Sequence, residues 1–133
     1  RNGAMFMESG RSYVYLIYGL HLCFNVVTGA AGEGEAVLIR ALEPLAGVEE
    51  MRARRGGEVS DRDLARGPGR LTRAMGITRE DDRKPLLDGG PLRLLERPVG
   101  WGAPELEVGP RVGITKSAEL PLRFRLRGSR WTS

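Results

Sequence analysis

Side chains suited to handling a nucleic-acid base are concentrated between residues 13 and 40. Tyr18 and Gly19 separate two apolar runs, which places the tyrosine at the tip of a tight turn, where its ring could insert into a base stack. Asn25 offers donors and an acceptor with which to test the exocyclic groups of a base. The alternatives are structural: Tyr18 packs on a neighbouring strand, and Asn25 satisfies buried backbone groups.

Two arginines occupy positions where a cation needs a partner. Arg40 interrupts the apolar run 35–42, so it must pair or reach an open cleft. It could hold a carboxylate, a phosphate or a water, or form a structural ion pair with Glu43 or with a carboxylate outside this chain. Arg70 follows residues 67–69 (Gly-Pro-Gly) at the expected start of a helix, where backbone N–H groups and a guanidinium together could bind phosphate.

The basic charge of the chain comes almost entirely from arginine. The formal net charge is +4, and Lys84 and Lys116 are the only lysines among 21 basic residues. Arginine suits phosphate, which favours an anionic partner, although a GC-rich genome or a thermophile would give the same composition. A row of arginines near the carboxyl end could follow a DNA backbone or simply form a solvated strand face. The row consists of Arg123, Arg125, Arg127 and Arg130.

The sequence contains few side chains that could bind a metal ion or form a disulfide. His21 is the only histidine and Cys23 the only cysteine, so an internal disulfide is excluded and the chain alone has too few ligands for a structural zinc site. We interpret both as structural residues and predict no metal and no cofactor. With no long apolar run and no signal peptide, we expect no membrane span and a cytoplasmic protein. Because the sequence begins at Arg1 without a methionine, we expect an amino-terminal part to be missing.

The elements that must position these residues indicate an α+β domain. Apolar alternation in the second strand predicts one core face and one partly polar face, the latter carrying His21, Cys23, Asn25 and Val27. Near the carboxyl end, Leu122, Phe124 and Leu126 are expected to face inward, with the intervening arginines outward. Predicted strands cover residues 12–18, 20–27, 35–42, 91–96, 111–115 and a segment from 120.

Helices are predicted between these strands by capping residues and apolar spacing. The first expected helix begins at Glu43-Pro44 and ends at residues 52–55. A short second helix covers 61–65 behind a Ser60 cap, and a third runs from Pro68 through Met75. The segment 78–90 is expected to be loop. We therefore predict a single domain over residues 1–133: a curved antiparallel sheet with a protruding β-hairpin and a few packed helices.

Ordered blocks of sequence resemble the alkyladenine DNA glycosylase family, also called 3-methyladenine or N-methylpurine DNA glycosylases. The blocks span nearly the whole chain and are more specific together than any single feature above. They are Arg1-Asn2 with Met5-Phe6-Met7, then residues 13–19 (YVYLIYG), 23–25 (CFN), 40–45 (RALEPL), 67–71 (GPGRL), 111–114 (RVGI), 121–124 (PLRF) and 127–129 (RGS) with Trp131.

The resemblance implies a monofunctional repair enzyme that flips damaged purines out of duplex DNA and hydrolyses their N-glycosidic bond. Its substrates would be alkylated or deaminated purines such as 3-methyladenine, 7-methylguanine, ethenoadenine and hypoxanthine, and its product an abasic site. It would act from the minor groove as a monomer, without a cofactor.

The resemblance also implies roles for individual residues. Tyr18 would fill the gap left by the flipped nucleotide, and Tyr15 would help sandwich the extruded base. Asn25 would discourage normal guanine through its exocyclic amino group. Arg40 would hold the attacking water together with the backbone carbonyl of Val112. Arg70 would contact a phosphate.

One part of the family pattern is absent from these 133 residues. The family's general base is a glutamate in a Glu-x-Tyr motif, followed by a pocket histidine, and both lie upstream of the position matching Arg1. His21 does not replace them, because it stands where relatives commonly carry tyrosine. The main alternative is a nucleic-acid or lesion-binding module on the same scaffold without hydrolysis, and a small-molecule enzyme is a distant third.

Overall fold

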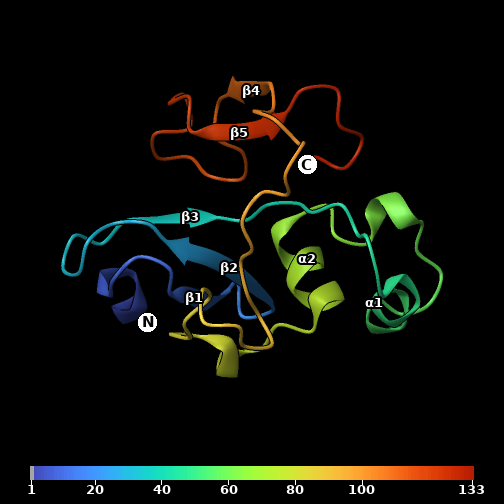
Figure 1. Cartoon of the computed structure of the whole chain (residues 1–133), viewed down its shortest axis with the longest axis horizontal. Helices are drawn as coiled ribbons and strands as arrows, with labels where there is room; N and C mark the ends of the chain where they lie inside the picture. The colour runs from blue at the N-terminus through green and yellow to red at the C-terminus, as the bar shows by residue number, and fades with distance from the viewer. Residues whose placement is uncertain (1) are drawn as a thin grey trace.

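A three-stranded antiparallel sheet forms the centre of the computed structural model, which describes residues 2–133 (Figure 1). Its strands lie in the order β1-β2-β3, with β2 in the middle, and two of them form the predicted hairpin. The register pairs Tyr13 with Asn25 and continues from Asn25 to Leu38 on the third strand. The strands are β1 (Ser12–Ile17), β2 (His21–Val27) and β3 (Ala36–Leu38).

The hairpin tip requires backbone angles that few residues adopt. Tyr18 has φ 54° and Gly19 has φ 64°, and the Leu20 N–H donates to the Ile17 carbonyl at 3.2 Å. Two consecutive positive φ values are those of a type I′ turn, whose twist matches that of a hairpin. Glycine meets this requirement without steric cost, whereas a tyrosine there holds an uncommon conformation.

Each face of this sheet has its own core. Helix α2 (Pro68–Met75) covers the face that carries Val14, Phe24 and Val26, and the Thr72 hydroxyl donates to the Leu22 carbonyl at 2.9 Å. A smaller cluster on the other face joins Tyr13 and Val27 to Ala4 of the short helix η1 (Gly3–Phe6). The alternation predicted for the second strand is therefore confirmed.

Three further helical segments surround this body. Helix α1 (Val48–Arg54) packs beside α2, and the 3-10 turn η3 (Arg79–Asp81) lies along the edge of β1. Asp81 and Thr78 form a reciprocal capping box that begins η3. The third segment is η2 (Asp61–Asp63), between α1 and α2.

A second sheet of two antiparallel strands, β4 (Leu106–Gly109) and β5 (Arg123–Leu126), lies on the far side of β3 from β1 (Figure 1). Side chains along both strands are at least partly exposed. Among the described residues, no helix is both long and apolar enough to cross a bilayer. The α+β class is confirmed, whereas the single-domain assignment stays a prediction.

Several predicted elements differ from the observed ones. The third strand is shorter than 35–42: regular pairing ends at Leu38, Ile39 makes one more hydrogen bond to β2, and Ala41 bridges Arg66 instead. The helix expected from Glu43 begins at Val48, since Gly47 adopts φ 70° and interrupts it. The segment 61–65 forms only the η2 turn, and 78–90 includes η3 rather than loop alone.

The predictions made from the sequence differ most from the structure in the carboxyl-terminal third of the chain. Residues 91–96 and 111–115 form no strands, the first mostly exposed and the second broken by Gly113 at φ 78°, and β4 was not predicted. The facing of β5 is also inverted. Phe124 is 60% exposed, whereas Arg123 and Arg125 are partly buried.

Candidate functional site

The polar face of the central sheet brings Tyr15, Asn25 and Arg40 together. Tyr15 pairs with Cys23 across β1 and β2. The Ile39 N–H donates to the Phe24 carbonyl at 3.0 Å, so pairing with β2 continues beyond β3. One further residue in that register sets Arg40 beside Cys23. The rows Tyr15-Cys23-Arg40 and Tyr13-Asn25-Leu38 therefore lie next to each other on one face.

Asn25 is the fixed polar group of this face. It is 6% exposed, and its Nδ2 donates to the Tyr13 carbonyl at 3.1 Å. The amide thus satisfies a backbone group, as one of the two interpretations of the sequence anticipated. The same hydrogen bond fixes the orientation of the side chain, which is the property that a group discriminating between bases needs.

Arg40 is an incompletely satisfied cation next to Asn25. Its side chain is partly buried, and its Nε atom is buried without a hydrogen-bond partner among the described residues. Burial lowers the pKa of Arg40 and the nearby Arg123 guanidinium lowers it further, while Cys23 acts in the opposite direction. No ion pair with Glu43 is found within residues 2–133. The guanidinium can therefore donate to a small polar molecule.

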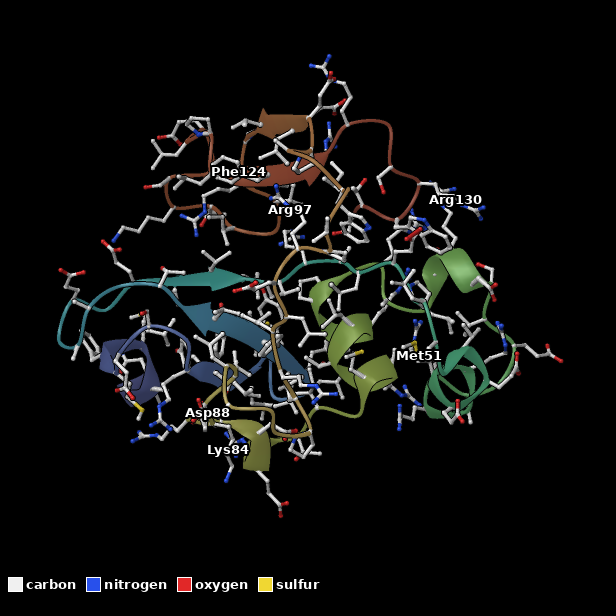
Figure 2. The ribbon with its side chains drawn as sticks, in the orientation of Figure 1. Met51, Lys84, Asp88, Arg97, Phe124 and Arg130 are labelled. Carbon is white, nitrogen blue, oxygen red and sulfur yellow. The ribbon has the colours of Figure 1, made fainter. Side chains whose placement is uncertain are left out.

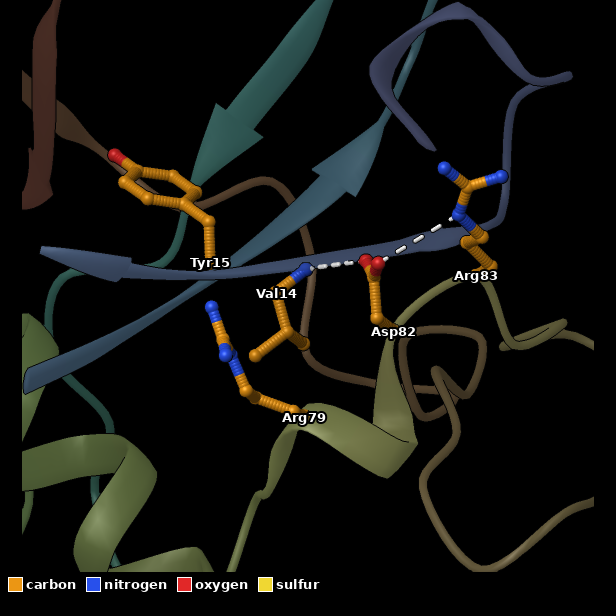
Figure 3. Close-up of a pocket in the computed structure, with 5 residues that line it drawn as sticks. All are labelled: Val14, Tyr15, Arg79, Asp82 and Arg83. Atoms are coloured by element: carbon orange, nitrogen blue, oxygen red, sulfur yellow. Dashed lines mark hydrogen bonds and ion pairs between the residues drawn. The ribbon is translucent and has the colours of Figure 1, made fainter. Parts of the chain in front are cut away.

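Tyr15 contributes a partly buried ring to the same row of the sheet, on the other side of Cys23 from Arg40. Its ring centroid lies 5.0 Å from that of Tyr13, with the two planes inclined by 32°. On the outer side of β1, Tyr15 also lines a cavity of about 240 Å³ together with Arg79 and Arg83 (Figure 3). Asp82 lies in this cavity but accepts from the Val14 N–H at 2.8 Å, with its second oxygen 3.7 Å from Arg83 Nε (Figure 3).

Tyr18 extends from the hairpin tip into solvent. Its side chain is 81% exposed, so the interpretation that it packs on a neighbouring strand is wrong. The ring shares a hollow of about 580 Å³ with the loop 113–116. An exposed ring on a turn defined by two strands can enter a gap in another molecule without rearranging the protein.

Arg70 lies in the first turns of α2, with half of its side chain exposed. Its Nη1 atom is 3.9 Å from Asp63 Oδ1, too far for a hydrogen bond, so its donors remain accessible to a phosphate. At the same end of the helix Gly69 lies against His21, where an added Cβ would come within 3.1 Å of the imidazole. The start of α2 is therefore held against the first residue of β2.

The predicted arginine row is largely engaged within the protein. Arg123 donates to the Pro110 and Ser133 carbonyls, both at 3.0 Å, and Arg125 Nε donates to Glu107 at 3.0 Å. Arg127 Nε lies 3.8 Å from Glu105 Oε2. Arg130 stacks over Trp131 at 4.8 Å. A role for this row in following a DNA backbone stays untested.

Val112, assigned a backbone contact with water by resemblance, lies in an exposed loop rather than in a strand. The hydrogen bond from Arg123 to Pro110 connects this loop to the neighbourhood of Arg40, because Arg123 acts on the pKa of Arg40. Sequence reasoning missed Arg123 here and missed the loop beside Tyr18. No local pattern identifies either, since both result from contacts between distant segments.

Among the described residues, no group of three or more His, Cys, Asp and Glu side chains could hold a metal ion. Cys23, the single cysteine of the sequence, is buried and forms no disulfide within the chain. The site therefore consists of an aromatic ring, an amide and a guanidinium on one sheet face, with a second aromatic ring at the hairpin tip.

This fold and site describe a small α+β domain with groups suited to a planar base. A family model for methylpurine-DNA glycosylase matches residues 1–130. The chain belongs to the methylpurine-DNA glycosylase family.

Curated relatives agree with this assignment. A Methanoculleus marisnigri protein named "Putative 3-methyladenine DNA glycosylase" is 53% identical over 135 residues, covering the whole chain and 69% of the relative. A Rhodopseudomonas palustris protein of the same name is 50% identical and covered to 64%. A "Probable DNA-3-methyladenine glycosylase" of Encephalitozoon cuniculi is 48% identical, also covered to 64%. The chain thus spans about two thirds of the length of these relatives.

Proposed function

We propose that this protein is a DNA repair glycosylase that flips alkylated or deaminated purines out of duplex DNA and hydrolyses their N-glycosidic bond. The observation that carries the proposal is that Tyr15, Asn25 and Arg40 share one face of the central sheet, in a domain whose hairpin tip exposes Tyr18. In this proposal the protein acts as a monomer from the minor groove, in the cytoplasm, on lesions such as 3-methyladenine, 7-methylguanine, ethenoadenine and hypoxanthine.

Binding is assigned to four side chains. Tyr18 enters the gap that the flipped nucleotide leaves, and Tyr15 stacks on the extruded purine. The Asn25 amide, held by its hydrogen bond to Tyr13, discourages guanine through a clash with the exocyclic amino group. The accessible guanidinium of Arg70 contacts a phosphate.

Hydrolysis is assigned to a water held by Arg40. The water oxygen bonds to C1′ of the sugar as the bond to the purine breaks, and the purine leaves with the bonding electrons. A purine alkylated at N3 or N7 is cationic and leaves readily, whereas a neutral lesion needs protonation as well. Arg40 donates to the water, the Val112 carbonyl accepts from it, and its proton passes to a carboxylate that the family resemblance places outside these 133 residues.

Single-turnover release of hypoxanthine or a 3-methyladenine analogue from a duplex, using the complete gene product, tests this assignment. Arg40→Gln should slow release on the order of 10²- to 10³-fold, the effect of removing one positioned donor, while leaving duplex binding nearly unchanged. Tyr18→Ala should lower both binding and release, because it removes the ring that holds the gap open.

The matched control is Arg93→Gln, which removes an exposed arginine with no recorded partner among the described residues. It should release the base at the wild-type rate. Tight lesion binding by the wild type without release would instead favour the binding module. Equal losses in Arg40→Gln and Arg93→Gln would show that net charge, and not the position of Arg40, governs the rate.

A further inference from the structure

The hollow beside the hairpin tip joins two segments that are far apart in the sequence. Tyr18 forms one side of it, and Gly113, Ile114, Thr115 and Lys116 form the other. Both sides are exposed, so the hollow is accessible from solvent. A molecule that receives the Tyr18 ring therefore also meets this loop.

The loop 113–116 is rich in unused hydrogen-bond donors. Its four backbone N–H groups form no hydrogen bond within residues 2–133. Lys116 is exposed and forms no ion pair with a carboxylate anywhere in residues 2–133. Backbone N–H groups with a lysine ammonium are donors that suit phosphate oxygens.

The loop is held in place despite its exposure. Arg111 N–H donates to the Ala118 carbonyl at 2.9 Å, and Leu120 N–H donates to Ser117 at 3.2 Å. Arg123 Nε fixes the preceding Pro110 through its carbonyl. The donors next to Tyr18 therefore keep one arrangement, which lowers the entropy lost on binding.

We propose that this loop is a phosphate-binding site for duplex DNA, in which Lys116 and the loop N–H groups hold a phosphodiester beside the inserted Tyr18. The inference rests on the proposed function and extends it to a contact outside the base pocket. The minor groove is about 6 Å wide and bounded by two sugar-phosphate strands, so a cation next to a ring inserted there meets a phosphate.

The chain supplies a matched control, since its only other lysine is Lys84. Figure 2 places Lys84 at the opposite end of the molecule from β4 and β5, and its side chain is likewise exposed without an ion partner among the described residues. Lys84→Gln and Lys116→Gln therefore remove the same charge from two surfaces.

The test measures binding of the complete gene product to an undamaged and a hypoxanthine-containing duplex over a series of salt concentrations. For Lys116→Gln we expect the slope of log K against log salt to fall by about 0.9, the value for one lost phosphate contact. Affinity should fall by the same factor on both duplexes, because a phosphate contact carries no base information. Lys84→Gln should keep the wild-type slope.

Three outcomes would overturn the inference. An unchanged slope for Lys116→Gln, in a protein that still releases hypoxanthine, would reject the phosphate site and leave the proposed function intact. Equal slope changes in both lysine variants would show a general charge effect instead of a local contact. A wild type that neither binds nor releases would reject the proposed function and this inference with it.

Discussion

The central sheet and the β4–β5 sheet follow the same alternating sequence pattern but bury it differently. On β2, Phe24 and Val26 are covered by α2, and Val27 on the opposite face packs with η1. On β5, Phe124 and Leu126 are 60% and 49% exposed. Alternation therefore shows which residues share a face, while the element packed on the sheet decides which face is buried.

The partly buried arginines of the two sheets also differ, in how fully their hydrogen-bond donors are satisfied. In the β4–β5 sheet, Arg123 and Arg125 are less exposed than their apolar neighbours because backbone carbonyls and Glu107 satisfy them. In the central sheet, Arg40 is partly buried without full satisfaction. The difference separates arginines that hold structure together from one available to a ligand.

The largest expected effect compares leucine truncations in the two regions. Leu71 of α2 is fully buried against the central sheet, so Leu71→Ala should lower the free energy of unfolding by about 2–5 kcal/mol. Leu126→Ala should lower it by less than about 1 kcal/mol, because half of that side chain already contacts water. Urea denaturation of both variants measures the difference.

This pair of variants can also break the comparison. If Leu126→Ala were as costly as Leu71→Ala in the complete gene product, the apolar face of β4–β5 would be packed in that protein. The two sheets would then differ only in which part of the chain covers them. A small cost for Leu71→Ala would instead contradict the assignment of α2 to the core.

Local sequence signals predicted the central sheet well. Tyr18-Gly19 predicted the hairpin tip because its turn geometry depends on adjacent residues, and residues 67–69 predicted the start of α2 for the same reason. Residues 91–96 carry a strand-like pattern yet form no strand, because strand formation also needs a partner at a suitable register. Such partners are set by long-range contacts, which no window of sequence contains.

The candidate site divides in the same way. Asn25 and Arg40 were singled out by residue type and Tyr15 by the family resemblance, and the register of β1–β3 places all three on one face. The loop 113–116 was not predicted to lie beside Tyr18. The two segments are 95 or more residues apart, and the local sequence of one carries no information about its contact with the other.

A second prediction sharpens the comparison through polar groups. Asn25→Ala should destabilise the protein by about 1–2 kcal/mol, because it removes the hydrogen bond that the buried Asn25 side chain donates to the Tyr13 carbonyl and leaves a small cavity. Glu107→Gln in the β4–β5 sheet should cost at most about 1 kcal/mol, since its pair with Arg125 is partly exposed. Thermal unfolding at one pH orders the two; a larger loss for Glu107→Gln would invert the contrast.

The smallest expected effect concerns the charges that support the central body. Hydrogen bonds from Arg66 lower the pKa of Asp63 below its ordinary value of 3.8. A carboxylate with a depressed pKa adds stability above that value, and this stability is lost as pH falls through the lowered pKa. Asp63→Asn should therefore lower the melting temperature slightly at pH 7, and the difference from wild type should shrink below pH 3.8.

Asp88→Asn is the matched control for this pH dependence, because Asp88 is exposed and has no recorded ion partner among the described residues (Figure 2). Its melting temperature should follow the wild type at every pH. A constant offset for Asp63→Asn from pH 7 to pH 3 would mean that the loss comes from packing or from the Ser60 hydrogen bond, not from ionisation. A difference that disappears on acidification would instead show that the charge of Asp63 stabilises the fold through its pair with Arg66, the residue directly before Gly67, which is the amino-terminal cap of α2.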